Sequence, residues 1–147
     1  MTLATYVETL NVLGDESRLR LCALLRGRDL CVSDLVHITG ITQPRVSTHL
    51  GRLREAGFVL DRRKGAQAFY TLASDLPPTV QTLLVSAEAS ADPLLEGDQR
   101  RLLELQAERR GGLAVSVADE LERYYSPGRT WQSLVAGLAG LLRLGDV

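Results

Sequence analysis

One stretch decides the fold of this chain: Ile41-Thr42-Gln43-Pro44-Arg45-Val46-Ser47-Thr48-His49-Leu50-Gly51-Arg52-Leu53-Arg54-Glu55-Ala56-Gly57. Thr42 is a favourable N-cap residue, because its hydroxyl can accept a hydrogen bond from an unpaired N–H of a first helical turn. Pro44 falls in that first turn, where its missing N–H costs little. Gly57 is typical of the residue that ends a helix. The stretch therefore predicts a helix between Thr42 and Gly57.

The two faces of this predicted helix differ in chemistry. Val46, Leu50 and Leu53 recur at i, i+4 and i+7 and form one apolar stripe. At about 100° per residue, the opposite face carries four residues: Pro44, Thr48, Arg52 and, beside them, Arg45. The stripe predicts a buried side, and the outer face indicates contact with a polyanion.

The flanking segments make this interpretation specific. Upstream, residues 32–40 predict a short helix with Leu35 and Ile38 inward and Gly40 at its end. Two helices joined by a short glycine-containing turn form a helix-turn-helix, whose second helix enters the DNA major groove.

Downstream, two β-prone runs at residues 58–63 and 68–72 flank residues 64–67, where Gly65 can supply the positive φ of a tight hairpin. The expected tip carries three basic residues in a row: Arg62, Arg63 and Lys64. A basic hairpin directly after a helix-turn-helix predicts a winged helix.

The rest of the chain predicts further helices and no repeats. The expected helices cover residues 4–13, 15–26, 78–90, 98–110, 115–125 and 131–142, with a loop over 90–97. In this interpretation Asp98 caps its helix, and Gly111 and Gly112 end it. The fold class is therefore mainly α with a small β-hairpin: a winged helix-turn-helix over residues 1–92 for DNA binding and dimerisation, then a helical extension or linker over 93–147.

The charge distribution supports nucleic-acid binding although the net charge does not. The chain of 147 residues carries a net charge of −1. Residues 41–70 hold six basic and two acidic side chains, a net charge of +4, so the remainder carries −5. A local basic patch on an acidic body is typical of DNA-binding proteins. The alternative, a solvated charge cluster, is disfavoured by the helix-turn-helix and hairpin around it.

The same residues resemble a known family. Residues 15–21, 30–35, 42–50, 53–59 and 62–65 are similar to the corresponding motifs of the ArsR/SmtB bacterial regulators. The resemblance implies a dimeric winged-helix repressor that leaves its operator when an inducer binds. It also implies that helices 4–13 and 78–90 form the dimer interface, and that the operator is an imperfect palindrome.

The expected DNA-binding residues lie on the recognition helix and the wing. They are Thr42, Gln43, Pro44, Arg45, Ser47, Thr48, His49, Arg52, Arg62, Arg63 and Lys64. Glutamine suits adenine and arginine suits guanine in the major groove, whereas the later basic residues are expected on phosphates. His49 has two interpretations: contact with DNA, which the resemblance favours, or a hydrogen bond within the domain.

Metal sensing and catalysis are not expected. Sensors of the family often carry Cys-x-Cys, but here the pattern is Cys31 followed by Ser33, and serine is a poor ligand for a soft metal. Residues 76–92 contain no histidine for the family's other common metal site. No paired catalytic carboxylates, Ser/His/Asp set or phosphate loop can be defended. We therefore expect no metal, no cofactor and no enzyme activity.

The end of the chain resembles a linker. Residues 122–131 and 141–147 are similar to the segment that joins ArsR-type regulators to a class I methyltransferase, but no glycine-rich loop for S-adenosylmethionine follows. No targeting or membrane-spanning pattern is present, which favours the cytoplasm. The expected function is a homodimeric DNA-binding repressor released by an unknown inducer. The alternative is a regulatory or interaction module of a methyltransferase, with secondary DNA binding.

Overall fold

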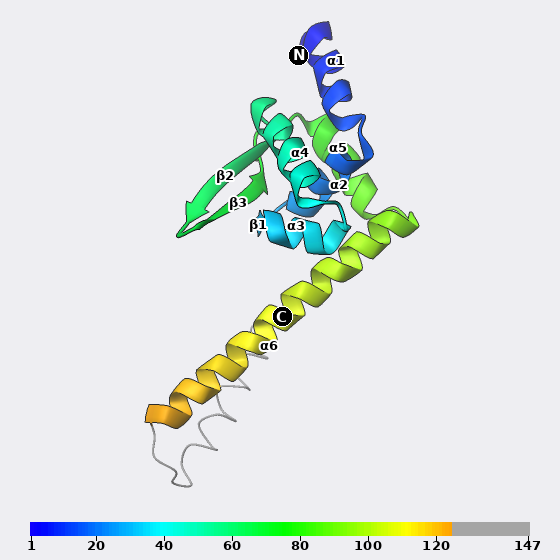
Figure 1. Ribbon diagram of the computed structural model, residues 1–147. Helices are drawn as coiled ribbons and strands as arrows, with labels where there is room; N and C mark the ends of the chain where they lie inside the picture. The colour runs from blue at the N-terminus through cyan, green and yellow to red at the C-terminus, as the bar shows by residue number, and fades with distance from the viewer. Residues whose placement is uncertain (125–147) are drawn as a thin grey trace. The chain divides into compact units, whose positions relative to one another are not determined.

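A computed structural model describes the backbone of residues 1–124 and the side chains of residues 1–119 (Figure 1). The elements in chain order are α1 (Leu3–Leu13), α2 (Glu16–Leu25), β1 (Leu30–Cys31), α3 (Val32–Thr39), α4 (Gln43–Glu55), β2 (Val59–Lys64), β3 (Gln67–Leu72), α5 (Pro78–Glu88) and α6 (Pro93–Tyr124). This order confirms the predicted winged helix-turn-helix. The predicted helix over residues 131–142 and most of the linker-like segments lie outside the described residues.

The chain divides into two units, Met1–Leu103 and Glu104–Val147. The first unit holds α1 to α5, the sheet and the first turns of α6, and it contains the whole candidate site. The division of function between residues 1–92 and 93–147 stays a prediction. Within the described part of the chain, no helix is both long enough and apolar enough to cross a membrane.

The helix-turn-helix is formed by α3 and α4, which pack on each other, and α4 also packs on α2. The predicted inward residues share complete burial, with 0% of their surface exposed: Leu35, Ile38, Val46, Leu50 and Leu53. Gly40 adopts a φ of +70°, which the turn between the helices requires and which glycine alone adopts without strain. The apolar stripe of the sequence is thus what fixes α4 to the domain.

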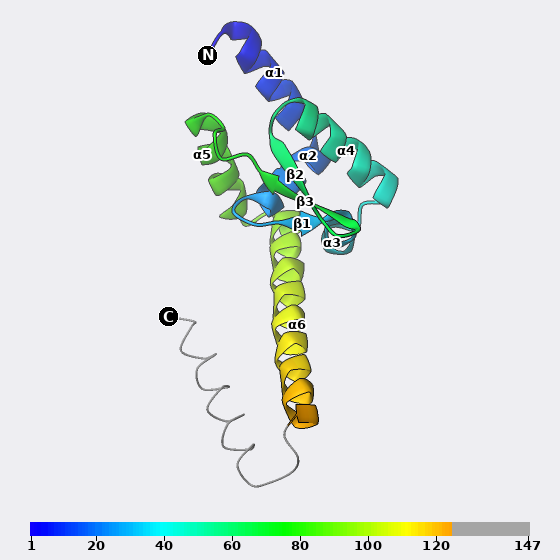
Figure 2. The same ribbon diagram turned by 90° about the vertical axis from the view of Figure 1, so that its left-hand side faces the viewer.

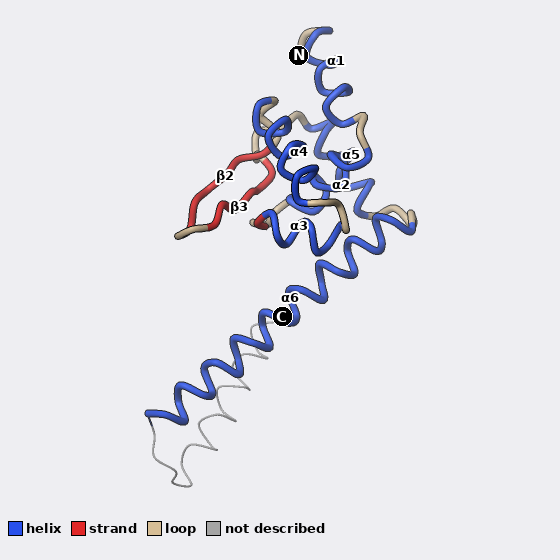
Figure 3. The backbone as a smooth tube through the Cα atoms, viewed as in Figure 1, coloured by secondary structure: helices blue, strands red, loops and turns tan. Residues whose placement is uncertain are grey.

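The wing is a tight antiparallel hairpin of β2 and β3, which appears as the pair of red strands in Figure 3. Lys64 pairs with Gln67, so the turn consists of Gly65 and Ala66 and is shorter than the four-residue loop that the sequence predicts. Gly65 has a φ of +62° and Ala66 a negative one, the combination typical of a type II′ turn. This turn matches the natural twist of the strands.

A third strand, β1, was not predicted. It is two residues long, and it pairs with β3 through Leu30 opposite Tyr70 and Cys31 opposite Phe69 (Figure 2). The sheet order is β1-β3-β2, so β3 is the central strand. Because β1 leads directly into α3, this pairing ties the base of the wing to the helix-turn-helix.

Two expectations about the extension were wrong. The helix α6 begins at Pro93, not at Asp98, because Asp92 Oδ1 accepts hydrogen bonds from the N–H groups of Leu94 at 2.9 Å and Leu95 at 3.2 Å. Asp98 lies inside the helix. Gly111 and Gly112 do not end α6, since neither adopts the positive φ of a helix-ending glycine.

Candidate nucleic-acid interface

The outer face of α4 is open along its first two turns. The exposed residues are Thr42, Gln43, Pro44, Arg45, Ser47 and Thr48. The other side of the helix carries the stripe of Val46, Leu50 and Leu53, and the complete burial of these side chains holds the helix in place. The structure thus brings together on one surface all the residues that the sequence assigns to base contacts.

The N-terminus of α4 differs from the prediction in one respect. Thr42 is the N-cap by backbone geometry, and its C=O accepts the N–H of Val46 at 3.0 Å. Its hydroxyl, however, makes no capping hydrogen bond within the described residues. The first turn contains no acidic side chain. The helix therefore presents a free hydroxyl and uncompensated N–H groups at its positive end, which favours a phosphate.

Thr48 has a restricted hydrogen-bonding capacity. Its Oγ1 donates to the backbone O of Pro44 at 2.9 Å, one turn earlier in the helix. The hydroxyl proton is thereby used within α4, which leaves the oxygen lone pairs and the methyl group for a partner. A threonine methyl suits the methyl group of thymine.

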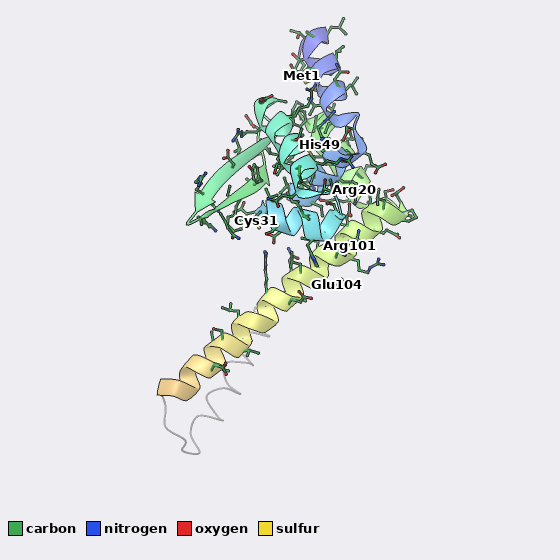
Figure 4. All side chains as sticks on the ribbon, viewed as in Figure 1. Met1, Arg20, Cys31, His49, Arg101 and Glu104 are labelled. Carbon is green, nitrogen blue, oxygen red and sulfur yellow. The ribbon has the colours of Figure 1, made fainter. Side chains whose placement is uncertain are left out.

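His49 lies at the edge of this surface and is largely covered. Its side chain, labelled in Figure 4, is 15% exposed. Its Nδ1 lies 3.9 Å from Oδ1 of Asp15, the residue before α2. Asp15 also caps α2: the N–H of Arg18 donates to Oδ1 at 3.0 Å and holds the pKa of that carboxyl below its ordinary value. The position of His49 thus allows a contact within the domain, and its role in DNA binding stays a prediction.

Arg52 occupies a different setting from the first two turns. It is exposed, and it borders a cleft of about 650 Å³ between α4 and α1. The other lining residues include Leu3, Val7, Glu8, Asn11 and Glu55. Arg52 makes no ion pair with any residue that the structure describes, so its guanidinium is available to a phosphate.

The three basic residues of the wing tip lie on two faces of the hairpin. In the register, Arg62 faces Phe69 and Lys64 faces Gln67, so both basic side chains share one face, and Arg63, paired with Ala68, points to the other. Lys64 Nζ lies 5.4 Å from the centre of the Phe69 ring. Arg63 has no ion pair within the described part of the chain. The row of charges in the sequence is therefore split in space.

Two acidic residues that the sequence analysis did not single out hold the wing. Asp29, in the loop before β1, accepts a hydrogen bond from Arg62 Nη2 at 2.5 Å. Asp61 of β2 lies 3.5 Å from the guanidinium of Arg54 at the end of α4. No local sequence pattern relates either pair, because the partners come from different elements. In this structure Arg62 thus pairs with a carboxylate through Nη2, and its side chain stays 64% exposed.

The thiols do not form a metal site of the family's Cys-x-Cys kind. Cys31 Sγ lies 3.0 Å from the hydroxyl of Ser33, and both cysteines are buried and free. Burial raises the pKa of the Cys22 thiol to about 12, which keeps it protonated. Among the residues whose side chains are described, no group of three or more metal-ligating side chains occurs. One thiol beside a hydroxyl is not a donor set that suits a soft metal. That the protein does not sense a metal stays a prediction.

Comparison with known proteins agrees with this geometry. Residues 15–60 match the family described as bacterial regulatory protein, arsR family. The arsenic resistance transcriptional regulator ArsR1 of Pseudomonas putida is 38% identical over 94 residues, which cover 63% of this chain and 73% of that protein. The arsenical resistance operon repressor of Escherichia coli is 39% identical over 72 residues, 48% of this chain and 62% of that protein.

Solved structures show the same fold. Reduced HlyU from Vibrio cholerae has a TM-score of 0.53 and 29% identity over 58% of this chain and 87% of its own. The transcriptional repressor BigR from Xylella fastidiosa has a TM-score of 0.51 and 32% identity over 57% and 83%. The chain belongs to the arsR family of bacterial regulatory proteins and is a winged helix-turn-helix transcriptional regulator.

Proposed function

We propose that this chain is a homodimeric repressor that binds an imperfectly palindromic operator in the bacterial cytoplasm and leaves it when an inducer binds. The observation that carries the proposal is the outer face of α4, where exposed polar side chains without an acidic residue in the first turn surround a completely buried stripe. A helix held in this way can enter a major groove without losing its contacts to the domain.

Base recognition falls to the first two turns of α4. Arg45 makes no ion pair with a described residue, so its planar guanidinium is free to bind guanine O6 and N7. Gln43 offers the donor and acceptor pair that adenine requires. Each such bidentate contact discriminates against a wrong base by about 1–3 kcal/mol. Ser47 and Thr48 add acceptor and methyl contacts beside them.

Phosphate contacts fix the register of the helix. Thr42 and the first N–H groups of α4 would bind one phosphate, and Arg52 and Arg63 would bind others. Arg62 and Lys64 can join them with the N–H donors that their contacts to Asp29 and to the Phe69 ring leave unused. His49 remains a candidate at the edge of this surface.

Dimerisation would use apolar surface that one chain leaves exposed. On α1 the exposed side chains are Leu3, Tyr6, Val7 and Leu10, and on α5 they are Leu83 and Val85. Large exposed apolar patches mark interaction sites. A two-fold dimer would present its two α4 helices to half-sites about one helical turn, or ~34 Å, apart.

The alternative, a regulatory module of a methyltransferase, has less support. The relatives reported above are named as transcriptional regulators and repressors, and the exposed face of α4 is the kind of surface that DNA binding uses. A regulator of this kind needs no catalytic group. The inducer, and the role of the extension in sensing it, are left to experiment.

Selection of bound fragments from random DNA, followed by titration in increasing salt, tests the proposal. Replacing Gln43 or Arg45 with alanine should relax the preference at one operator position. Replacing Arg63 with alanine should weaken binding to all sequences and flatten the slope of log K against log salt by about one unit. Arg100→Gln, an exposed arginine on α6, is the matched control. If the selection yields no preferred sequence and Arg63→Ala changes no slope, α4 and the wing are not a DNA interface.

A further inference from the structure

A buried ionic cluster joins the start of α6 to α2. Asp98 of α6 is 2% exposed and Arg20 of α2 is 6% exposed. The guanidinium of Arg20 donates from Nε to Asp98 Oδ2 and from Nη2 to Asp98 Oδ1, both at 2.8 Å. Arg101, one turn further along α6, donates from Nη2 to the same Oδ1 at 3.1 Å. One carboxylate is thus held by two guanidinium groups; Figure 4 labels the two arginines, Arg20 on α2 and Arg101 on α6.

Both arginines also hold the end of α3. Arg20 Nη2 donates to the backbone O of Thr39 at 2.9 Å, and Arg101 Nε donates to the backbone O of Ile38. These are two of the last carbonyls of α3, which have no partner within the helix and favour a cation. Directly after them comes Gly40, where the chain turns toward α4. The cluster therefore lies on the turn of the helix-turn-helix.

Hydrogen bonds continue from the end of α3 into that turn. Thr39 Oγ1 donates to the backbone O of Leu35 and accepts the N–H of Ile41 at 3.2 Å. The N–H of Gly40 donates to the backbone O of Val36 at 2.9 Å. The Ile41 amide thus depends directly on Thr39, whose backbone carbonyl Arg20 holds, and the Gly40 amide, which follows Thr39 in the chain, is held by Val36.

A glycine in α6, Gly97, leaves space for the side chain of Arg101 but makes the helix less stable. Gly97 lies inside the helix, where glycine is less favourable than alanine. A Cβ at Gly97 would lie 3.3 Å from Nη1 and from Nη2 of Arg101. The absence of a side chain there lets the Arg101 guanidinium fold back over the helix to reach Ile38. A methyl group at this position would therefore crowd the guanidinium and force it to shift by a few tenths of an ångström.

We propose that Arg20, Asp98 and Arg101 are positioning residues that couple α6 to the DNA-reading helix. The docked first turns of α6 fix the end of α3, and the end of α3 fixes the direction in which α4 leaves the turn. Any ligand or partner domain that displaces the start of α6 then changes operator affinity. This inference rests on the proposed function, and it gives the extension a physical route to the site. A purely structural role predicts instead that the cluster affects global stability alone.

The test replaces Arg101 with glutamine in the full chain, with Arg100→Gln as the matched control on the same helix. Amide hydrogen exchange is followed under native conditions, where local opening is resolved from global unfolding. Arg101→Gln should speed exchange at Gly40 and Ile41 by about tenfold, within the usual range of couplings between sites, and leave the wing amides unchanged. Operator affinity should fall by a similar factor, with a smaller loss on non-specific DNA.

A second variant keeps the test decisive if Arg101→Gln does not fold. Gly97→Ala favours the helix but crowds the Arg101 guanidinium, so it should slow exchange within α6 and speed it at Ile41. Equal changes at all amides, or no difference from Arg100→Gln, would overturn the coupling. If the turn responds as expected but the wild-type protein binds no operator, the coupling stands and the proposed DNA-binding function fails.

Discussion

Asp98→Asn removes the one negative charge between two guanidinium groups. An asparagine of the same shape still offers an oxygen, but its NH₂ group would face an N–H donor of Arg20. The Arg20 guanidinium would then remain buried without its paired carboxylate, with only the exposed Glu16 nearby as a negative charge among the described side chains. Removing one partner of a buried pair typically costs about 3–5 kcal/mol, a large part of the roughly 5–15 kcal/mol that stabilises a small domain. We expect the melting temperature to fall by more than about 10 °C.

Urea unfolding followed by circular dichroism measures this loss. The midpoint should fall by at least about 1 M, given usual slopes of about 1–3 kcal/mol per M. Glu104→Gln, which removes an exposed carboxylate from the same helix, should have little effect. Replacing Arg20 with methionine and Asp98 with leucine together should restore most of the stability, because it leaves no buried charge unpaired. A loss below about 1 kcal/mol in Asp98→Asn would refute the reasoning.

Three further predictions concern the wing, acid stability and metals. Asp29→Asn frees Arg62 and removes a negative charge near the DNA. The affinity for non-specific DNA should therefore rise by a few-fold, about the effect of one exposed ion pair. A lower affinity of the variant in titrations at fixed salt would contradict this. The pKa of Asp15 is lowered in the folded state, so its contribution is complete above the unfolded value and is lost as pH falls through the folded value. Asp15→Asn should therefore lose less stability than wild type between pH 7 and about pH 3 in urea unfolding. Because Ser33 stands where metal sensors of the family often carry a second thiol, zinc or arsenite at one equivalent should not release DNA, and calorimetry should show no tight one-per-subunit zinc site.

The helix-turn-helix could be predicted because its signals are local. Val46, Leu50 and Leu53 repeat with the period of a helix, and each is completely buried. Gly40 ends α3 and Gly57 follows the end of α4, both with positive φ angles, as expected from residues that lack a Cβ. Such periodic and terminal signals need no knowledge of the tertiary contacts.

The arrangement of the wing required the structure. The two-residue strand β1 exists only because Leu30 and Cys31 pair with β3, some forty residues later in the chain. The row of Arg62, Arg63 and Lys64 indicates a basic tip, but only the register shows that Arg63 points away from the other two. Which face of the hairpin a side chain points to depends on how the two strands pair. A sequence that allows two loop lengths does not determine that pairing.

Asp98 shows most clearly where local rules fail. Acidic residues near a helix start are typical N-caps, and both Asp92 and Asp98 satisfy that rule. Asp92 is the one that caps the helix, whereas Asp98 pairs with Arg20, 78 residues away in the sequence, whose buried guanidinium requires a carboxylate. The sequence did hold a signal that Arg20 needs a buried partner. Arg20 follows Leu19 and precedes Leu21 and Cys22 in a helix that is otherwise largely apolar and buried. An arginine there must find a partner, because an unpaired buried charge is costly. The pairing of Arg20 with Asp98 also places the first turns of α6 beside the end of α3, and this contact is the basis for the proposed influence of the extension on a site that it does not form.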